Sequence, residues 1–190
     1  MPVRAVRLLA LCGLVCALLS PLGGARPAQA AASDWLDHDH AQLRLIAASD
    51  SVGETEELRL GLHFKLQPGW KIYWRSPGDA GYPPAIDWRS SGNLAGAEFQ
   101  WPVPHRFSLF GLETFGYGDE VVLPIAARPE RPGEAVALSA QVSYLVCSDI
   151  CVPHEGTLSL DLPAGPGTSA LHAFLIDQAR SLVPGLGAEA

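Results

Sequence analysis

Long apolar runs, cysteines and internal repeats are all scarce in this 190-residue chain. One apolar run lies near the amino terminus, and no second run is long enough to cross a bilayer, which excludes a protein with several membrane spans. No repeat or low-complexity tract is present, so solenoid and fibrous architectures are excluded as well. The four cysteines fall into two pairs, one inside the apolar run and one in the last third of the chain.

Positive charge is also in short supply. The net charge is −7, and residues 1–30 carry three arginines but no acidic residue. The rest of the chain therefore has 10 basic and 20 acidic residues, a net charge of −10. This balance argues against nucleic acid and anionic membrane surfaces as partners.

Residues 1–30 have the three-part plan of a secretory signal peptide. Arg4 and Arg7 supply positive charge, residues 8–19 are apolar, and the small-residue pattern Ala-Gln-Ala ends at Ala30. The apolar stretch is too short for a membrane span. We expect cleavage near Ala30 and export of the remaining chain, which has no membrane part of its own.

The exported chain of about 160 residues is long enough for one domain with an adequate hydrophobic core, so it does not need a disulfide in order to fold. Its only cysteines are Cys147 and Cys151. In an oxidising compartment such a pair should spend at least part of its life as a disulfide.

Alternating polarity predicts an all-β fold. Residues 57–66 alternate strictly, with leucine or phenylalanine at each even position from Leu58 to Leu66, which is typical of a half-buried strand. Clusters of proline and glycine, such as SPGDAGYPP and RPERPGE, predict frequent turns between such runs. Short alternating strands separated by turns indicate a β-sandwich. The same period recurs in residues 43–45, 70–74, 121–125, 136–146 and 158–162.

A helix is predicted for residues 169–183, after the linker PAGPGT. Thr168 or Ser169 can cap it and Pro184 ends it. We expect it to pack against the sandwich. The residues that fall near one stripe of this helix are Leu171, Phe174, Leu175 and Leu182.

The alternation of apolar and polar residues before Cys147 predicts where the cysteine pair lies. From Val136 to Val146 the even positions are mostly apolar, so Cys147 is predicted on the wetter face at the end of this strand. The next strand is expected to begin near Thr157, which makes residues 147–155 the connection of a hairpin. Both cysteines would then lie in a loop at the edge of the sandwich, where functional residues are common.

The residues alone leave three interpretations of Cys147 and Cys151 open. As a structural staple the pair is weak, because closing a loop of about five residues contributes roughly 2 kcal/mol, against about 4.7 kcal/mol for a loop of about 100 residues. As a metal site the pair could join His154, with His38 and His40 as further ligands for copper or zinc, but the spacing matches no common zinc pattern.

The third interpretation is a redox-active dithiol, which must be accessible and have its partner sulfur nearby. The loop position and the spacing meet both needs. Asp149 and Glu155 are negative neighbours, and no lysine or arginine occurs from Ser139 to Leu162. Such neighbours disfavour the thiolate, which makes a dithiol a better reductant than oxidant.

Three segments together resemble the amino-terminal periplasmic domain of DsbD-type thiol:disulfide interchange proteins, and most closely the ScsB branch, which is associated with suppression of copper sensitivity. The likeness covers residues 35–162 and is fairly specific. The segments are QPGWKIYWRSPGDAGYPPAIDW, FSLFGLETFGYGDEVVLP and VSYLVCSDICVPHEGTLSLDLP.

The resemblance implies an immunoglobulin-like sandwich in the periplasm without a cofactor or metal. It also implies a component of a protein-disulfide reductase, which takes electrons from a membrane-embedded cysteine pair and passes them to periplasmic thioredoxin-fold proteins. By the same resemblance Cys151 exchanges with the client and Cys147 resolves the mixed disulfide. The implied domains are a signal peptide at residues 1–30, the redox domain at 31–163, and a linker with a helix at 164–190.

Members of this family also carry a cap loop whose aromatic residue covers the disulfide. The matching residues are Phe107, Leu109, Phe110 and Gly111, with Phe110 or Leu109 as the predicted lid; from the residues alone, ordinary core packing is the alternative.

The resemblance also places Tyr73 near the pair, and we count Asp149 and His154 as further near-site residues because they lie within or just after it.

Two departures from the family pattern are visible. Its best-known members have five residues between the cysteines, whereas three intervene here, so the ring is tighter. The family's membrane domain and its terminal thioredoxin-like domain are also absent from these 190 residues, so the electron donor lies outside them. The alternative function is a non-enzymatic periplasmic sandwich that binds copper or a protein partner and has a merely structural disulfide.

Overall fold

The computed structural model describes residues 31–109 and 111–185. The predicted signal peptide, residues 1–30, lies outside this part of the chain. The elements in chain order are β1 (Leu36–His38), β2 (Ala41–Ala47), β3 (Leu58–Leu66), β4 (Lys71–Gly78), β5 (Ala85–Asp87), β6 (Leu94–Phe99), β7 (His105–Leu109), β8 (Leu112–Gly118), β9 (Glu120–Pro129), β10 (Val136–Cys147), β11 (Cys151–Leu162) and α1 (Ala173–Ser181).

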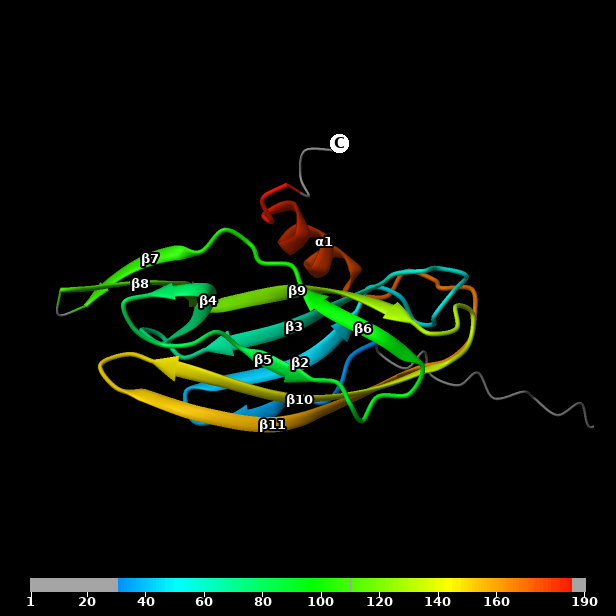
Figure 1. Cartoon of the computed structure of the whole chain (residues 1–190), viewed down its shortest axis with the longest axis horizontal. Helices are drawn as coiled ribbons and strands as arrows, with labels where there is room; N and C mark the ends of the chain where they lie inside the picture. The colour runs from blue at the N-terminus through cyan, green and yellow to red at the C-terminus, as the bar shows by residue number, and fades with distance from the viewer. Residues whose placement is uncertain (1–30, 110, 186–190) are drawn as a thin grey trace, which may run out of the picture.

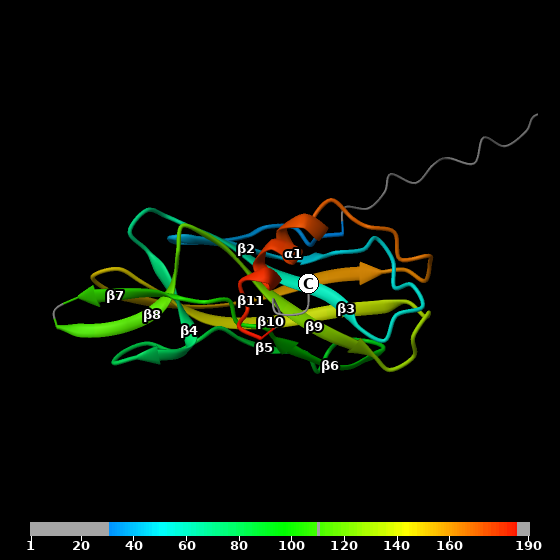
Figure 2. The same cartoon turned by 90° about the horizontal axis from the view of Figure 1, so that it is seen from above.

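The strands form two antiparallel sheets that pack face to face (Figure 1). One sheet has the order β1-β2-β3-β9-β6, and the other has the order β11-β10-β4-β8-β7, with β5 paired to β10. Helix α1 lies on the outer face of the first sheet, against β3 and β9 (Figures 1 and 2). The prediction of an immunoglobulin-like β-sandwich with a short carboxyl-terminal helix is confirmed. In the described part of the chain, no helix is long and apolar enough to cross a membrane.

The core fills the space between the two sheets, and the alternating residues of β3 lie within it. The even-numbered side chains from Leu58 to Leu66 are all buried there, as the pattern predicts. The other face of β3 was predicted to be polar and wet, but its central residues Gly61 and His63 are buried too. Helix α1 covers this face, so β3 is buried on both sides at its middle.

The predicted apolar stripe on the helix was wrong for three of its four residues, and only Leu175 is partly buried against the sheet. The helix contacts the sheet through Ala173, Ile176 and Ala179, which pack against residues of β2 and β9. By contrast, Leu171 is 85% exposed and Phe174 is 73% exposed. Small side chains on the helix allow close approach to a flat sheet surface.

Gly61 makes this approach possible. A methyl group at this position would lie 2.7 Å from Val122 Cγ1 and 3.2 Å from Ile176 Cγ1. Ile176 therefore fits over a strand position that has no side chain, and a larger residue there would push the helix away.

Two buried histidines lie beneath this helix. His63 Nδ1 accepts a hydrogen bond from Arg44 Nε (3.4 Å), and because arginine can only donate, the His63 proton lies on Nε2, which bonds Glu120 (2.6 Å). Burial is the main factor that lowers the pKa of His63, and Arg44 lowers it further against the opposing hydrogen bond to Glu120. Burial also lowers the pKa of His172, the residue at the N-cap position of α1, whose side chain makes no capping hydrogen bond.

These histidines predict that the protein loses stability in mild acid. Their folded pKa values lie below the unfolded value of about 6.5, so the folded chain binds fewer protons, and stability is fully present above about pH 6.5 and falls as the pH drops through the folded pKa values. We expect the free energy of unfolding to be lower at about pH 5 than at about pH 7.5, with His63 as one contributor. Urea unfolding at both pH values measures this difference.

The matched variants are His63→Gln, which keeps a donor and an acceptor but cannot titrate, and His105→Gln at an exposed position. The first should flatten the pH dependence and the second should leave it unchanged. An equal slope in wild type and His63→Gln would rule out a contribution from His63 and leave only that of His172.

Candidate functional site

The β10–β11 hairpin brings the two cysteines together. Its strands pair without interruption from Val136↔Leu162 to Cys147↔Cys151, which is the last pair before the turn. The two cysteines form a disulfide, and their Cα atoms are 4.1 Å apart. The connection was predicted to span residues 147–155, but only residues 148–150 form it.

This difference has a simple cause. The strand continues through Pro153, which the sequence favours as part of a loop, but β11 is the edge of its sheet. A proline is tolerated on an edge strand because its missing N–H faces solvent rather than a neighbouring strand.

The two cysteines differ in exposure. Cys147 is only 1% exposed and packs with Tyr73 and Leu145 in a small cluster of its own, on the face of the sheet opposite the main core. The alternation of apolar and polar residues along β10 therefore predicted the correct face of the sheet for Cys147. The prediction that Cys147 is exposed to solvent was wrong, because β4 residues cover it. Cys151, on the same side of the hairpin, is exposed. A partner thiol can thus reach Cys151 far more easily than Cys147.

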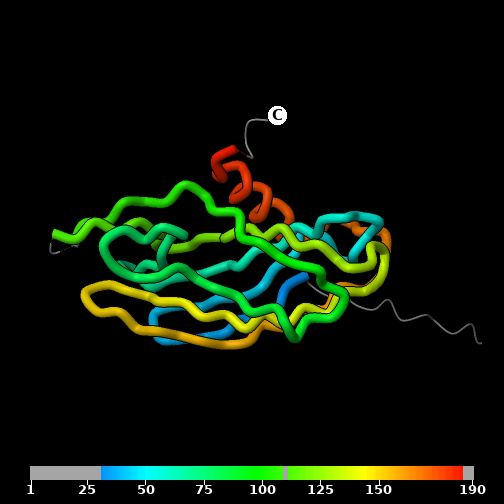
Figure 3. The backbone as a smooth tube through the Cα atoms, in the orientation of Figure 1, coloured from blue at the N-terminus to red at the C-terminus, as the bar shows by residue number. Residues whose placement is uncertain are grey.

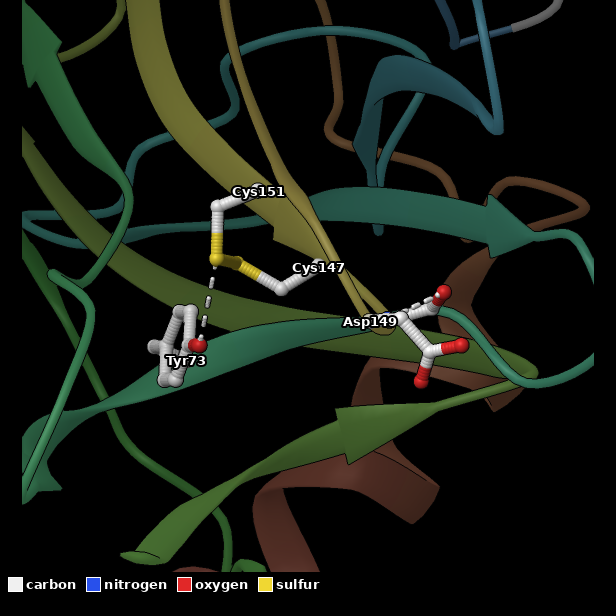
Figure 4. The surroundings of a disulfide bond; sticks show 5 residues. Tyr73, Cys147, Asp149 and Cys151 are labelled. Atoms are coloured by element: carbon white, nitrogen blue, oxygen red, sulfur yellow. Dashed lines mark hydrogen bonds between the residues drawn. A yellow bond between two sulfur atoms is a disulfide. The ribbon is translucent and has the colours of Figure 1, made fainter. Parts of the chain in front are cut away.

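Tyr73 contacts the exposed sulfur (Figure 4). Its hydroxyl lies 3.8 Å from Cys151 Sγ, and since a disulfide sulfur carries no proton, the hydroxyl is the donor. Burial raises the pKa of the Tyr73 hydroxyl, so it stays protonated and able to donate. The hydroxyl end of the ring also faces Gly81 in the β4–β5 loop, where a Cβ atom would overlap it.

Lys71 is the second β4 residue at the site, and sequence reasoning missed it. It is the direct cross-strand partner of Cys147, so the two side chains project from the same face of the sheet. Lys71 is 8% exposed, and its Nζ lies 4.9 Å from the centre of the Phe107 ring and 5.9 Å from that of Tyr73. Burial lowers the pKa of the Lys71 ammonium.

Comparison with known proteins places this arrangement in a family. The family described as "Thiol:disulfide interchange protein DsbD, N-terminal" matches residues 40–163, about two thirds of the chain. The chain belongs to the DsbD N-terminal family. The predicted resemblance is thus confirmed.

Two solved structures resemble this DsbD N-terminal family member. The N-terminal periplasmic domain of ScsB from Proteus mirabilis is 33% identical, with a TM-score of 0.65 over 82% of this chain and 60% of that one. The present chain thus spans three fifths of that domain. The N-terminal domain of DsbD from Neisseria meningitidis in the reduced form is 15% identical, with a TM-score of 0.36 over 67% of this chain and 89% of that one. A search of curated proteins finds no match.

The segment that corresponds to the family's cap lies in the β7–β8 hairpin. Phe107, one of the predicted cap residues, is half-buried on β7, and its ring lies against Lys71 Nζ. Gly111 is in the turn that follows. Phe110 and the side chain of Leu109, the predicted lid residues, lie outside what the structure describes. The β7–β8 hairpin, the β4–β5 loop and the β10–β11 turn gather at the same end of this DsbD-type domain (Figure 3).

The structure separates the remaining near-site residues. Asp149 is in the β10–β11 turn, and its carboxylate points away from the disulfide (Figure 4). His154 projects from the opposite face of β11, where its ring stacks on His38 with centroids 4.6 Å apart. It therefore does not share the environment of the cysteines. Among the described residues, no three of histidine, cysteine, aspartate and glutamate are grouped as metal ligands.

Proposed function

We propose that this domain relays electrons through Cys147 and Cys151, from a membrane-embedded cysteine pair in another protein or domain to periplasmic thioredoxin-fold clients. Its proposed parts are a signal peptide at residues 1–30, the redox domain at 31–163, and a linker with a helix at 164–190. The observation that carries this proposal is the unequal exposure of the two sulfur-bearing residues: Cys151 is open to a partner while Cys147 is enclosed.

The chemistry follows from this asymmetry. In the dithiol form, the Cys151 thiolate attacks a client disulfide and forms a mixed disulfide, and one client sulfur leaves as a thiolate. Cys147 then attacks Cys151 Sγ, which closes the internal disulfide and releases the second client sulfur. The client gains two electrons and the dithiol loses two. Reduction by the donor runs through the same steps in reverse, beginning with attack on Cys151.

The surface around the disulfide suits a protein partner. Three exposed apolar side chains stand on the loops at this end of the molecule: Tyr82 in the β4–β5 loop, Leu112 at the start of β8, and Ile150 in the β10–β11 turn. Apolar and aromatic groups around an accessible reactive residue are typical of protein contact sites.

A redox titration tests the proposal. We expect the disulfide of the folded protein to open and close reversibly across a series of reduced and oxidised glutathione, followed by alkylation of free thiols and mass measurement. Circular dichroism at each point checks that the fold is intact, which is expected because a domain of this size does not depend on a five-residue ring. A disulfide that resists reduction until the protein unfolds would instead support a structural bond.

A further inference from the structure

Lys71 is a buried cation beside a sulfur that has to become an anion. It pairs with Cys147 across the β4–β10 ladder, and both residues are nearly inaccessible, at 8% and 1% exposure. Directly opposed residues in an antiparallel pair have Cβ atoms about 4.5–5.5 Å apart on one face. The flexible four-carbon stem of lysine lets its amine reach a sulfur on that neighbour.

The surroundings of Lys71 leave its charge without an acidic partner. Within residues 31–109 and 111–185, no carboxylate forms an ion pair with it, and burial is the only cause of its lowered pKa. The titratable groups placed beside it are Tyr73 on its own strand and Cys147 across the ladder, and the carboxylate of Asp149 in the β10–β11 turn points away from the disulfide. In the disulfide form the ammonium lies instead over the ring of Phe107.

Cys147 in the dithiol form needs such a partner. A thiol in apolar surroundings resists ionisation, yet only the thiolate attacks a disulfide. Tyr73 approaches Cys151 rather than Cys147, and Leu145 is apolar. Lys71 is thus the basic group that the sheet places next to the resolving sulfur.

We propose that Lys71 accepts the proton of Cys147 and stabilises its thiolate, an inference that rests on the resolving role of Cys147 in the proposed function. In the dithiol form the proton moves from Cys147 Sγ to the neutral amine of Lys71, which becomes an ammonium, and the thiolate attacks Cys151 Sγ. The Cys147–Cys151 bond forms while the bond from Cys151 to the client breaks, and the electron pair leaves with the client sulfur. In the opposite direction, Lys71 stabilises Cys147 as the leaving thiolate when a donor attacks Cys151.

The direct test is a thiolate titration of Cys147 in a Cys151→Ser background, followed by ultraviolet absorbance. Lys71→Met retains the apolar stem and removes the charge, so we expect at least about tenfold less thiolate at neutral pH. Lys71→Arg should preserve most of the thiolate. Lys65→Met is the matched control, because Lys65 is the only other lysine of the chain and lies half-exposed on the other sheet.

The kinetic test uses a mixed disulfide between Cys151 and glutathione. In the wild-type protein Cys147 should release glutathione quickly at neutral pH, and in Lys71→Met about tenfold more slowly, with the difference closing at alkaline pH where the thiol ionises unaided. Lys71→Gln serves as a second neutral variant if Lys71→Met is poorly folded by circular dichroism.

The results of these tests distinguish a failure of the Lys71 inference from a failure of the proposed electron relay. Equal thiolate titrations in Lys71→Met, Lys71→Gln and wild type would overturn the role of Lys71, even if the disulfide exchanges freely. A titration shifted by Lys71→Met in a protein that transfers no electrons to thioredoxin-fold clients would support the Lys71–Cys147 pair and overturn the proposed function instead.

Discussion

Replacing Cys151 with serine is expected to abolish exchange with a client disulfide, while replacing Cys147 with alanine is expected to stop the reaction at a mixed disulfide. The first change removes the only exposed sulfur of the pair, and loss of a nucleophile costs at least about a thousandfold in rate. The second change leaves the attacking sulfur in place but removes the group that releases the client.

The choice of substituents follows from burial. Cys147 lies in an apolar cluster, so alanine avoids a buried hydroxyl with no hydrogen-bond partner. Cys151 is exposed, and serine there meets water at little cost. Neither variant should unfold, because the ring that the disulfide closes is short and contributes only about 2 kcal/mol.

Trapping measures both effects when the thioredoxin-fold protein lacks its own resolving cysteine and carries its remaining cysteine as a mixed disulfide with thionitrobenzoate, which leaves when Cys151 attacks. We expect the reduced Cys147→Ala variant to yield a covalent complex that dithiothreitol dissociates, and the Cys151→Ser variant to yield none. A complex that forms through Cys147 instead would reverse the assigned roles. If neither variant forms a complex and the wild-type disulfide also resists reduction, the disulfide is structural rather than redox-active. Copper binding that survives the loss of both cysteines would then indicate histidine ligands.

Much of the fold could be predicted because its strands are marked locally. Strict alternation identified β3 and β10, and the three matching segments identified the family. Five strands were not identified: β1, β5, β6, β7 and β8. They have only three to seven residues or contain glycine, and so weak an alternation of apolar and polar residues also occurs in loops. Most of the helix stripe was wrong because the largest apolar residues suggested the buried face, whereas the sheet is contacted by two alanines and by Ile176, which fits over Gly61.

The site was only half predictable for a different reason. Alternation in residues 70–74 places Lys71 and Tyr73 on one face of a strand, and that much was available locally. Which residue lies opposite Lys71 depends on the pairing of β4 with β10, strands far apart in the chain, and nothing in either segment specifies that register. The sequence around Cys147 contains no lysine or arginine, although Lys71 lies next to it across the sheet.

Substituting Gly81 with alanine should both destabilise the protein and open the disulfide to reductants. Gly81 has φ of +90°, a region that alanine adopts only at a cost of roughly 1–2 kcal/mol. The added methyl group would also overlap three carbon atoms at the hydroxyl end of the Tyr73 ring. That end carries the oxygen next to Cys151 Sγ, so the ring has to shift and its contact with the disulfide is disrupted.

Gly69→Ala separates these two causes. Gly69 has a similar φ of +82°, but no atom lies within 4 Å of the position that its Cβ would occupy. We expect Gly69→Ala to show the backbone cost alone, and Gly81→Ala to lose a further 1–3 kcal/mol, roughly, from overpacking against the ring. Urea unfolding of the oxidised proteins at neutral pH gives both values.

Reduction by dithiothreitol supplies the functional readout, because Tyr73 covers Cys147 and contacts Cys151. The disulfide of Gly81→Ala should be reduced faster than that of wild type, whereas Gly69→Ala should match wild type. Equal rates in all three proteins, despite the extra loss of stability in Gly81→Ala, would show that Tyr73 packs the site without shielding its sulfur atoms. A faster rate confined to Gly81→Ala would make the tyrosine ring the element that couples the β4–β5 loop to the reactivity of the cysteine pair.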